Sequence, residues 1–88
     1  MRATHLIIHG RVQGVFYRDW TVRNARELGL AGWVRNRSDG TVEAHLEGDD
    51  SAVQRMIAAM QAGPPRAQVE RIEQREVEPQ GLEGFARR

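Results

Sequence analysis

The fold of this chain is decided by residues 10–18, which read GRVQGVFYR. They follow the apolar run Leu6–Ile8 and precede a segment with helical periodicity, which predicts a strand, a glycine-bearing turn and a helix. Such a turn gathers unpaired backbone N–H groups at the positive end of the helix dipole, where an anion is favoured. Gly10 and Gly14 can adopt positive φ and bring the backbone close to a ligand. Arg18 adds a planar guanidinium that matches two phosphate oxygens.

A second group of residues, at 32–48, predicts a β-hairpin. Gly32–Asn36 reads as one strand and Thr41–Gly48 as the next. Asp39-Gly40 between them is a strong hairpin signal, because glycine supplies the positive φ that such turns need. Asn36 lies just before the turn, where a short polar side chain is also typical of a turn former. Taken alone, each group has this simpler structural explanation, and it is their combination that points to a function.

Together the two groups resemble the two signatures of the acylphosphatase family, with their internal spacing intact, over nearly the whole chain. Tyr17 is a small departure, since the family more often has phenylalanine there. The segment 84–88 is also poorer in β-branched residues than the family's last strand. The resemblance implies a hydrolase that cleaves acyl phosphates to a carboxylate and inorganic phosphate. It implies that Arg18 binds the phosphate and that Asn36 orients the attacking water.

The chemistry of an acyl phosphate suits such a sparse site. Its carboxylate is already a good leaving group, so the loose transition state needs mainly positioning and charge stabilisation. Arg18 would supply these together with backbone N–H groups of the loop, which belong to Gln13, Gly14, Val15, Phe16 and Tyr17. We expect no metal and no cofactor, and we expect inorganic phosphate and sulfate to compete with the substrate. The alternative is a non-catalytic anion-binding regulatory module, which the presence of both Arg18 and Asn36 disfavours.

Size and composition limit the possible functions. Eighty-eight residues predict one domain, 1–88. The net charge is +1, and the 13 basic residues, all arginine, are interspersed with 12 acidic ones, so neither a nucleic acid nor a membrane is expected as a partner. The chain has no cysteine, which excludes disulfides, thiolate nucleophiles and cysteine-based zinc sites. Since no apolar span approaches ~18 residues, we expect a soluble, cytoplasmic protein, with a monomer as the default.

The periodicity along the chain predicts the order βαββαβ. It indicates a ferredoxin-like α+β sandwich with an antiparallel sheet, two helices on one face and a short extra C-terminal edge strand anchored by Phe85. Residues 19–28 have the first helical pattern, and Asp49–Ser51 offer N-cap oxygens to a second helix. Val69 and Ile72 are out of phase within the last long strand, so a bulge or a break is expected between them.

The remaining polar and aromatic residues are interpreted as structural. His5, His9 and His45 alternate with apolar residues, which predicts surface positions on the sheet face away from the helices. Trp20 is expected to pack, close enough to Arg18 to form a wall of the site. An RNA-binding domain of similar topology would carry aromatic residues on its central strands, and the sequence lacks them. A domain of a hydrogenase maturation factor resembles the same motifs, but that architecture adds cysteine-bearing segments that this chain lacks.

Overall fold

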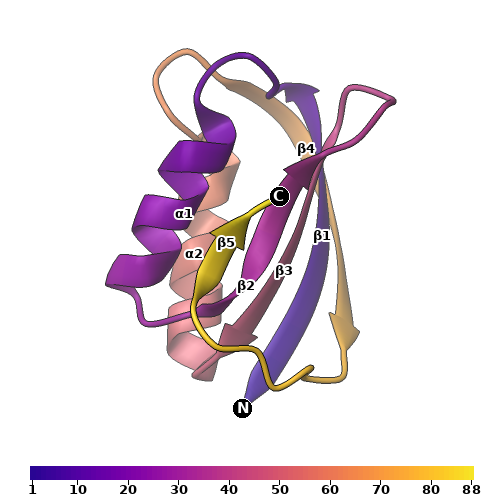
Figure 1. Ribbon diagram of the computed structural model, residues 1–88. Helices are drawn as coiled ribbons and strands as arrows, with labels where there is room; N and C mark the ends of the chain where they lie inside the picture. Colours follow the sequence, from indigo (N-terminus) through magenta and orange to yellow (C-terminus); the bar gives the residue numbers. More distant parts are fainter.

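The computed structural model describes all 88 residues, as five strands and two helices (Figure 1). In chain order these are β1 (Arg2–Arg11), α1 (Tyr17–Glu27), β2 (Ala31–Asn36), β3 (Val42–Gly48), α2 (Asp50–Ala62), β4 (Gln68–Val77) and β5 (Phe85–Arg87). The strands form one sheet in the order β4-β1-β3-β2-β5. The pairs among β1 to β4 are antiparallel, as expected, and confirm the ferredoxin-like fold. The short C-terminal edge strand is also present, but it pairs in parallel with β2, so the sheet is mixed.

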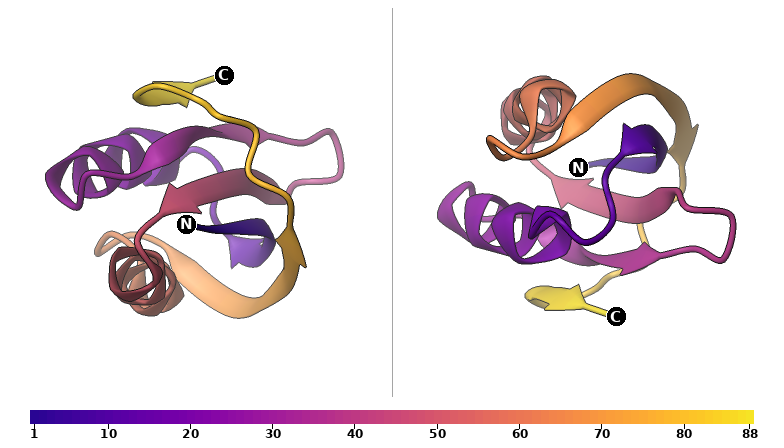
Figure 2. Two further views of the ribbon diagram at one scale, coloured as in Figure 1. Left: turned by 90° about the horizontal axis from the view of Figure 1, so that it is seen from below. Right: turned by 90° about the horizontal axis from the view of Figure 1, so that it is seen from above.

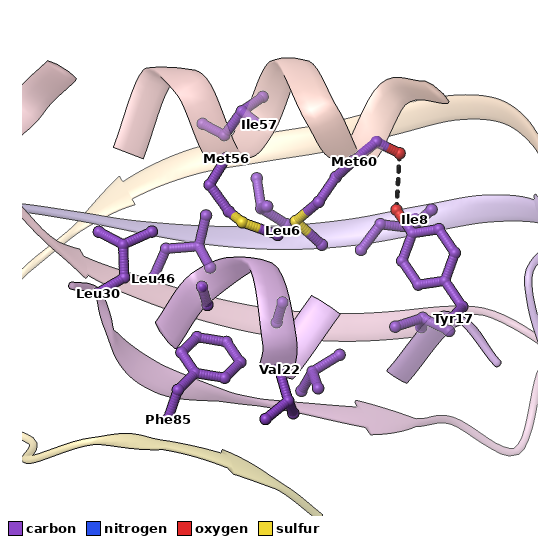
Figure 3. Close-up of a cluster of buried hydrophobic side chains, with 14 of the residues drawn as sticks. Leu6, Ile8, Tyr17, Val22, Leu30, Leu46, Met56, Ile57, Met60 and Phe85 are labelled. Atoms are coloured by element: carbon purple, nitrogen blue, oxygen red, sulfur yellow. Dashed lines mark hydrogen bonds between the residues drawn. The ribbon is translucent and has the colours of Figure 1, made fainter. Parts of the chain in front are cut away.

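Both helices cover the same face of the sheet (Figure 2). The period-2 and period-3.6 apolar patterns meet in the core between these layers, where the fully buried side chains include Leu6, Val34 and Met56. Figure 3 shows this cluster of buried apolar side chains, which extends from the sheet to α2. The buried residues of α2 are those that its helical periodicity predicts: Val53, Met56, Ile57 and Met60. The core therefore packs α1 against β2 and β5, and α2 against β4, β1 and β3.

The start of α2 differs from the prediction in one respect. Asp49 is its N-cap residue, but the side chain makes no hydrogen bond to the first turn. The neighbouring Asp50 instead pairs with Arg2 of β1, with 3.0 Å between Oδ1 and Nη1. The predicted capping bond is therefore wrong, although the helix begins where it was expected.

The predicted irregularity in the last long strand is confirmed. The register between β1 and β4 shifts after His9. His9 lies opposite Arg71, but the next residue, Gly10, lies opposite Val69, so Glu70 has no partner on β1. A Cβ atom built on Gly10, whose φ is 126°, would lie 2.2 Å from the backbone oxygen of Gln68. Gly10 therefore allows close approach of β4, and not of a ligand as the sequence suggested.

The sheet face away from the helices is partly covered by the segment 78–84, which leads from β4 to β5. Glu47 on this face accepts hydrogen bonds from the backbone N–H groups of Gln80 (2.8 Å) and Leu82 (3.0 Å). His45 is buried beside it, with 2.7 Å between Nε2 and Glu47 Oε1, and stacks on Trp33. The prediction that His45 is a surface residue is therefore wrong, because the side chain is buried between Trp33 and a Glu47 that is itself held by the segment 78–84. His5 and His9 lie partly exposed on the same face.

Glu47 is expected to make the stability of the fold depend on pH. Burial alone would raise the pKa of Glu47, but the hydrogen bonds from Gln80, His45 and Leu82 outweigh it and hold the pKa below its ordinary value. The carboxylate therefore contributes stability that is complete above the unfolded-state pKa of about 4.3 and is lost as the pH falls through the lower folded-state pKa. Glu47→Gln should lower the free energy of unfolding near neutral pH by about 1–3 kcal/mol, because an amide leaves a donor unsatisfied.

The measurement is urea unfolding of the wild type and the variant across the acid range. The difference between them should shrink as the pH falls, and a difference that stays constant would contradict the assignment. Glu78→Gln is the matched control, since Glu78 is exposed in the same segment and has no hydrogen-bonded partner.

Candidate active site

The loop between β1 and α1 leaves a group of backbone donors unpaired. None of the backbone N–H groups of residues 13–17 donates a hydrogen bond within the chain, and the first donor of the helix is Trp20, whose N–H bonds Phe16 O at 3.0 Å. Gly14 (φ 73°) and Phe16 (φ 64°) adopt left-handed conformations. For Phe16, which precedes α1, this conformation costs roughly 1–2 kcal/mol. Strain of this kind is typical of a functional loop.

A side chain of the loop ties it to the β2–β3 hairpin. Gln13 Nε2 donates hydrogen bonds to the backbone oxygens of Arg37 (2.8 Å) and Thr41 (2.9 Å), the two ends of the hairpin turn. Because the same hairpin carries Asn36, Gln13 fixes the position of the loop relative to that amide. The sequence analysis considered only the backbone of Gln13. Nothing in its local sequence indicates this contact over 24 residues.

Tyr17 anchors the first turn of α1 on α2. Its hydroxyl donates to the backbone oxygen of Met60 at 2.7 Å, a bond drawn in Figure 3. Burial raises the pKa of the Tyr17 phenol above its ordinary value, so the group stays neutral and acts as a donor. The hydroxyl that distinguishes this chain from the family's more frequent phenylalanine is therefore satisfied in the core. Its ring also packs against Trp20, with centroids 5.6 Å apart.

A cavity of about 230 Å³ lies between this loop, the start of α1 and the end of β2. Its lining residues are Val12, Gly14, Phe16, Tyr17, Arg18, Asp19, Asn36 and Arg87. A Cβ atom at Gly14 would meet nothing within 4 Å, so the backbone here is open to a ligand. The structure thus brings Arg18, Asn36 and part of the loop to one cavity. Gln13 and Val15 do not line it.

Arg18 and Asn36 both keep polar atoms that no protein carboxylate uses. Arg18 makes no ion pair, and its Nη1 donates only to the backbone oxygen of Arg88, at 3.1 Å. Asn36 Oδ1 is buried and has no hydrogen-bond partner. A buried acceptor without a partner is rare in folded proteins and calls for an explanation, such as a water bound beside it. The cavity is therefore lined by an arginine with one donor used by the main chain and by loop residues with unpaired N–H groups, together with a residue whose acceptor is unsatisfied.

The sequence analysis missed three residues of the cavity, Val12, Asp19 and Arg87, and misplaced Trp20. Arg87 Nη1 and Asp19 Oδ1 form an ion pair 2.8 Å long, and both residues line the cavity. Arg87 reaches it because β5 runs parallel to β2, a pairing without a sequence signal. Trp20 does not line the cavity and instead packs partly buried against the core. A larger depression of about 840 Å³ lies beyond the other end of α1, but neither Arg18 nor Asn36 contributes to it.

No group of three or more His, Cys, Asp or Glu side chains is arranged to hold a metal ion. Neither helix is long and apolar enough to cross a membrane. The cavity offers a metal ion only one carboxylate, that of Asp19, which already pairs with Arg87. The arrangement favours the binding of an anion by backbone donors and arginine.

The fold and the cavity define an α+β protein with a candidate anion site between a β–α loop and a β-hairpin. The chain belongs to the acylphosphatase family, because the family model described as Acylphosphatase matches residues 4–87. A protein named Acylphosphatase from Acidiphilium cryptum is 53% identical over 88 residues, which are 100% of this chain and 97% of that relative. One of the same name from Thermococcus kodakarensis is 56% identical over 81 residues, 92% of this chain and 89% of the relative.

Solved structures agree with these relatives. The crystal structure of acylphosphatase from Bacillus subtilis superposes with a TM-score of 0.95 at 38% sequence identity, and the match covers 98% of this chain and 97% of that one. The family resemblance of the sequence and the expected fold are therefore both confirmed. The roles of individual residues follow from the geometry of this chain and are proposed below.

Proposed function

We propose that this chain hydrolyses acyl phosphates to a carboxylate and inorganic phosphate at the cavity around Arg18 and Asn36. One observation supports this most: Arg18 and Asn36 line the same small cavity as Gly14, Phe16 and Tyr17, whose backbone N–H groups are unpaired. Membership of the acylphosphatase family agrees with the proposal. The anion donors alone would suit a binding module, but the additional free acceptor suits a reaction with water.

The loop and Arg18 bind the phosphoryl group. Its oxygens accept hydrogen bonds from the backbone N–H groups of Gln13 to Tyr17, at the positive end of α1. The Arg18 guanidinium donates to two further positions on the same group and neutralises part of its charge. In the transition state the charge on the phosphoryl oxygens is stabilised by these fixed donors, so little reorganisation is needed.

Asn36 holds the attacking water in line with the bond to the acyl oxygen. Its side-chain amide hydrogen-bonds the water, whose oxygen attacks phosphorus while the bond between phosphorus and the acyl oxygen breaks. The carboxylate leaves with the bonding electrons and needs no protonation. The proton of the water passes to a phosphoryl oxygen, so that the products are a carboxylate and inorganic phosphate. No serine, threonine or cysteine lines the cavity, and its one carboxylate, Asp19, is paired with Arg87, so the scheme uses direct attack by water and no covalent phosphoenzyme.

The same donors recognise any tetrahedral anion, so inorganic phosphate and sulfate are proposed to compete with the substrate. No step of the scheme uses a metal ion or a cofactor. The monomeric state and the cytoplasmic location stay predictions from the sequence.

The test is a turnover assay with benzoyl phosphate beside 4-nitrophenyl phosphate. We expect rapid release of benzoate from the first compound and none of 4-nitrophenol from the second, since a phenolate leaving group needs help that this site lacks. EDTA should leave the rate unchanged. In ¹⁸O-labelled water the label should enter phosphate and not benzoate, because the scheme breaks the bond to phosphorus.

Three outcomes would contradict parts of the proposal. Phosphate binding without turnover of benzoyl phosphate would indicate the non-catalytic anion-binding module. Loss of activity with EDTA that Mg²⁺ or Zn²⁺ restores would refute the metal-independent scheme. Label in benzoate would show attack at the carbonyl carbon, for which Asn36 is not placed.

A further inference from the structure

A second, basic cavity adjoins the candidate active site. It has a volume of about 570 Å³ and is lined by Asp19, Val22, Arg23, Arg26, Glu27 and Arg87. Asp19 and Arg87 line both cavities, so the two meet at this ion pair. The candidate phosphate site therefore continues into a groove lined by residues of α1 and by Arg87 of β5. Figure 1 shows where these two elements lie in the fold.

The groove has an excess of positive charge. Four arginines and two carboxylates line the two cavities together. Arg23 is exposed and has neither an ion pair nor a hydrogen-bonded partner. It lies on one face of α1 with Asp19, four residues before it, and Arg26, three residues after it. Arg26 is different, because its guanidinium donates to the backbone oxygen of Phe85. Arg87 uses only Nη1 for Asp19, which leaves its other donors free.

The spacing suits a substrate that carries two anionic groups. Asp19 and Arg23 are four residues apart on α1, which is about 6 Å along the helix axis. An acyl group that leaves the phosphate site past Asp19 and Arg87 therefore brings a distal anion next to Arg23. With the phosphate bound by the loop and by Arg18, the cations that remain for this second anion are Arg23 and Arg87.

We infer that Arg23 and Arg87 select acyl phosphates whose acyl part carries a second negative charge, a carboxylate or a phosphate, over those with a neutral acyl part. This inference rests on the proposed function and names the substrate class of the same site. Neither residue takes part in bond breaking. Arg87 positions the acyl group at the mouth of the cavity, and Arg23 pairs with its distal anion.

The experiment compares kcat/KM for 4-carboxybenzoyl phosphate and 4-methylbenzoyl phosphate, which differ at the distal position by a charge. At low ionic strength the wild type should prefer the carboxylated substrate roughly 5-fold, the size expected of an exposed charge pair. Added NaCl should reduce this preference. Arg23→Gln should bring the ratio of the two kcat/KM values close to one, and Arg23→Glu should invert it. Arg87→Gln should also lower the ratio of the two kcat/KM values, because it removes a cation and leaves the Asp19 carboxylate unpaired at the mouth of the cavity.

Arg55→Gln is the matched control. Arg55 lies exposed and unpaired on α2 and lines neither cavity, so the variant removes the same charge elsewhere and should keep the wild-type ratio. A wild-type ratio near one, or the same ratio in Arg23→Glu as in Arg55→Gln, would overturn the inference while the proposed hydrolysis stands. Failure of the wild type to hydrolyse either substrate would instead refute the proposed function, and this inference with it.

Discussion

Replacing Arg18 by glutamine is expected to lower kcat/KM for benzoyl phosphate at least ~10²-fold, the loss typical of removing a donor to a transition-state oxyanion. Glutamine is shorter and neutral, so it removes both the charge and the planar fork. Arg18 is partly exposed on the first turn of α1 and makes no ion pair, so the fold should survive the change. Steady-state kinetics together with a thermal melt of the variant measure both effects.

Phosphate-induced stabilisation provides a second readout for the same variant. An anion that binds only the folded state adds RT ln(1 + [L]/Kd), which is about 2.7 kcal/mol at ~100 Kd of phosphate. The melting temperature of the wild type should rise accordingly, and that of Arg18→Gln should rise much less. Arg11→Gln is the control, because Arg11 is exposed beside the same loop and does not line the cavity. Equal phosphate shifts in all three proteins would show that the anion binds elsewhere.

Asn36→Ala is expected to lower kcat at least ~10²-fold and to leave phosphate affinity largely intact. The reason is that the amide is proposed to position water, and misplacement of a reacting group costs about this factor. Phosphate capture uses the loop and Arg18, which the substitution does not touch. Because Asn36 Oδ1 has no partner within the chain, its removal breaks no hydrogen bond of the fold.

The measurements are kcat, the inhibition constant of phosphate and the melting temperature. Asn24→Ala is the matched control, because it removes the same side chain from α1. Asn24 hydrogen-bonds the backbone oxygen of Trp20 and does not line the cavity, so its replacement should leave kcat near the wild-type value. If phosphate affinity falls in parallel with kcat in Asn36→Ala, the amide shapes the loop and does not hold the water.

Much of the fold could be predicted because local patterns determine it. The strand–turn–helix at 10–18, the Asp39-Gly40 hairpin and the apolar face of α2 depend on residues close together in the chain. The sequence also revealed the out-of-phase pair Val69 and Ile72, since a period-2 pattern cannot pass through a bulge unbroken. Arg18 and Asn36 could be found as candidates because Arg18 ends the strand–turn–helix stretch 10–18 and Asn36 ends the first strand of the hairpin.

The rest depends on contacts that have no local pattern. The segment 78–84 has no periodicity, yet it supplies two N–H groups to Glu47. The parallel pairing of β5 brings Arg87 to Asp19, 68 residues earlier in the chain. The side-chain bonds of Gln13 likewise depend on the finished tertiary structure. In each case the missing information is which groups lie side by side once the sheet has formed.

The bulge in β4 has a consequence for the behaviour of the protein at high concentration. β4 is an edge strand ten residues long, and a flat, unpaired edge of that length invites strand addition and aggregation. Here Glu70 interrupts the ladder, and charged side chains follow it along the strand: Arg71, Glu73, Arg75 and Glu76. An incoming strand would have to match an irregular register and bury several of these charges. The longer of the two sheet edges is thus poorly suited to nucleate fibrils.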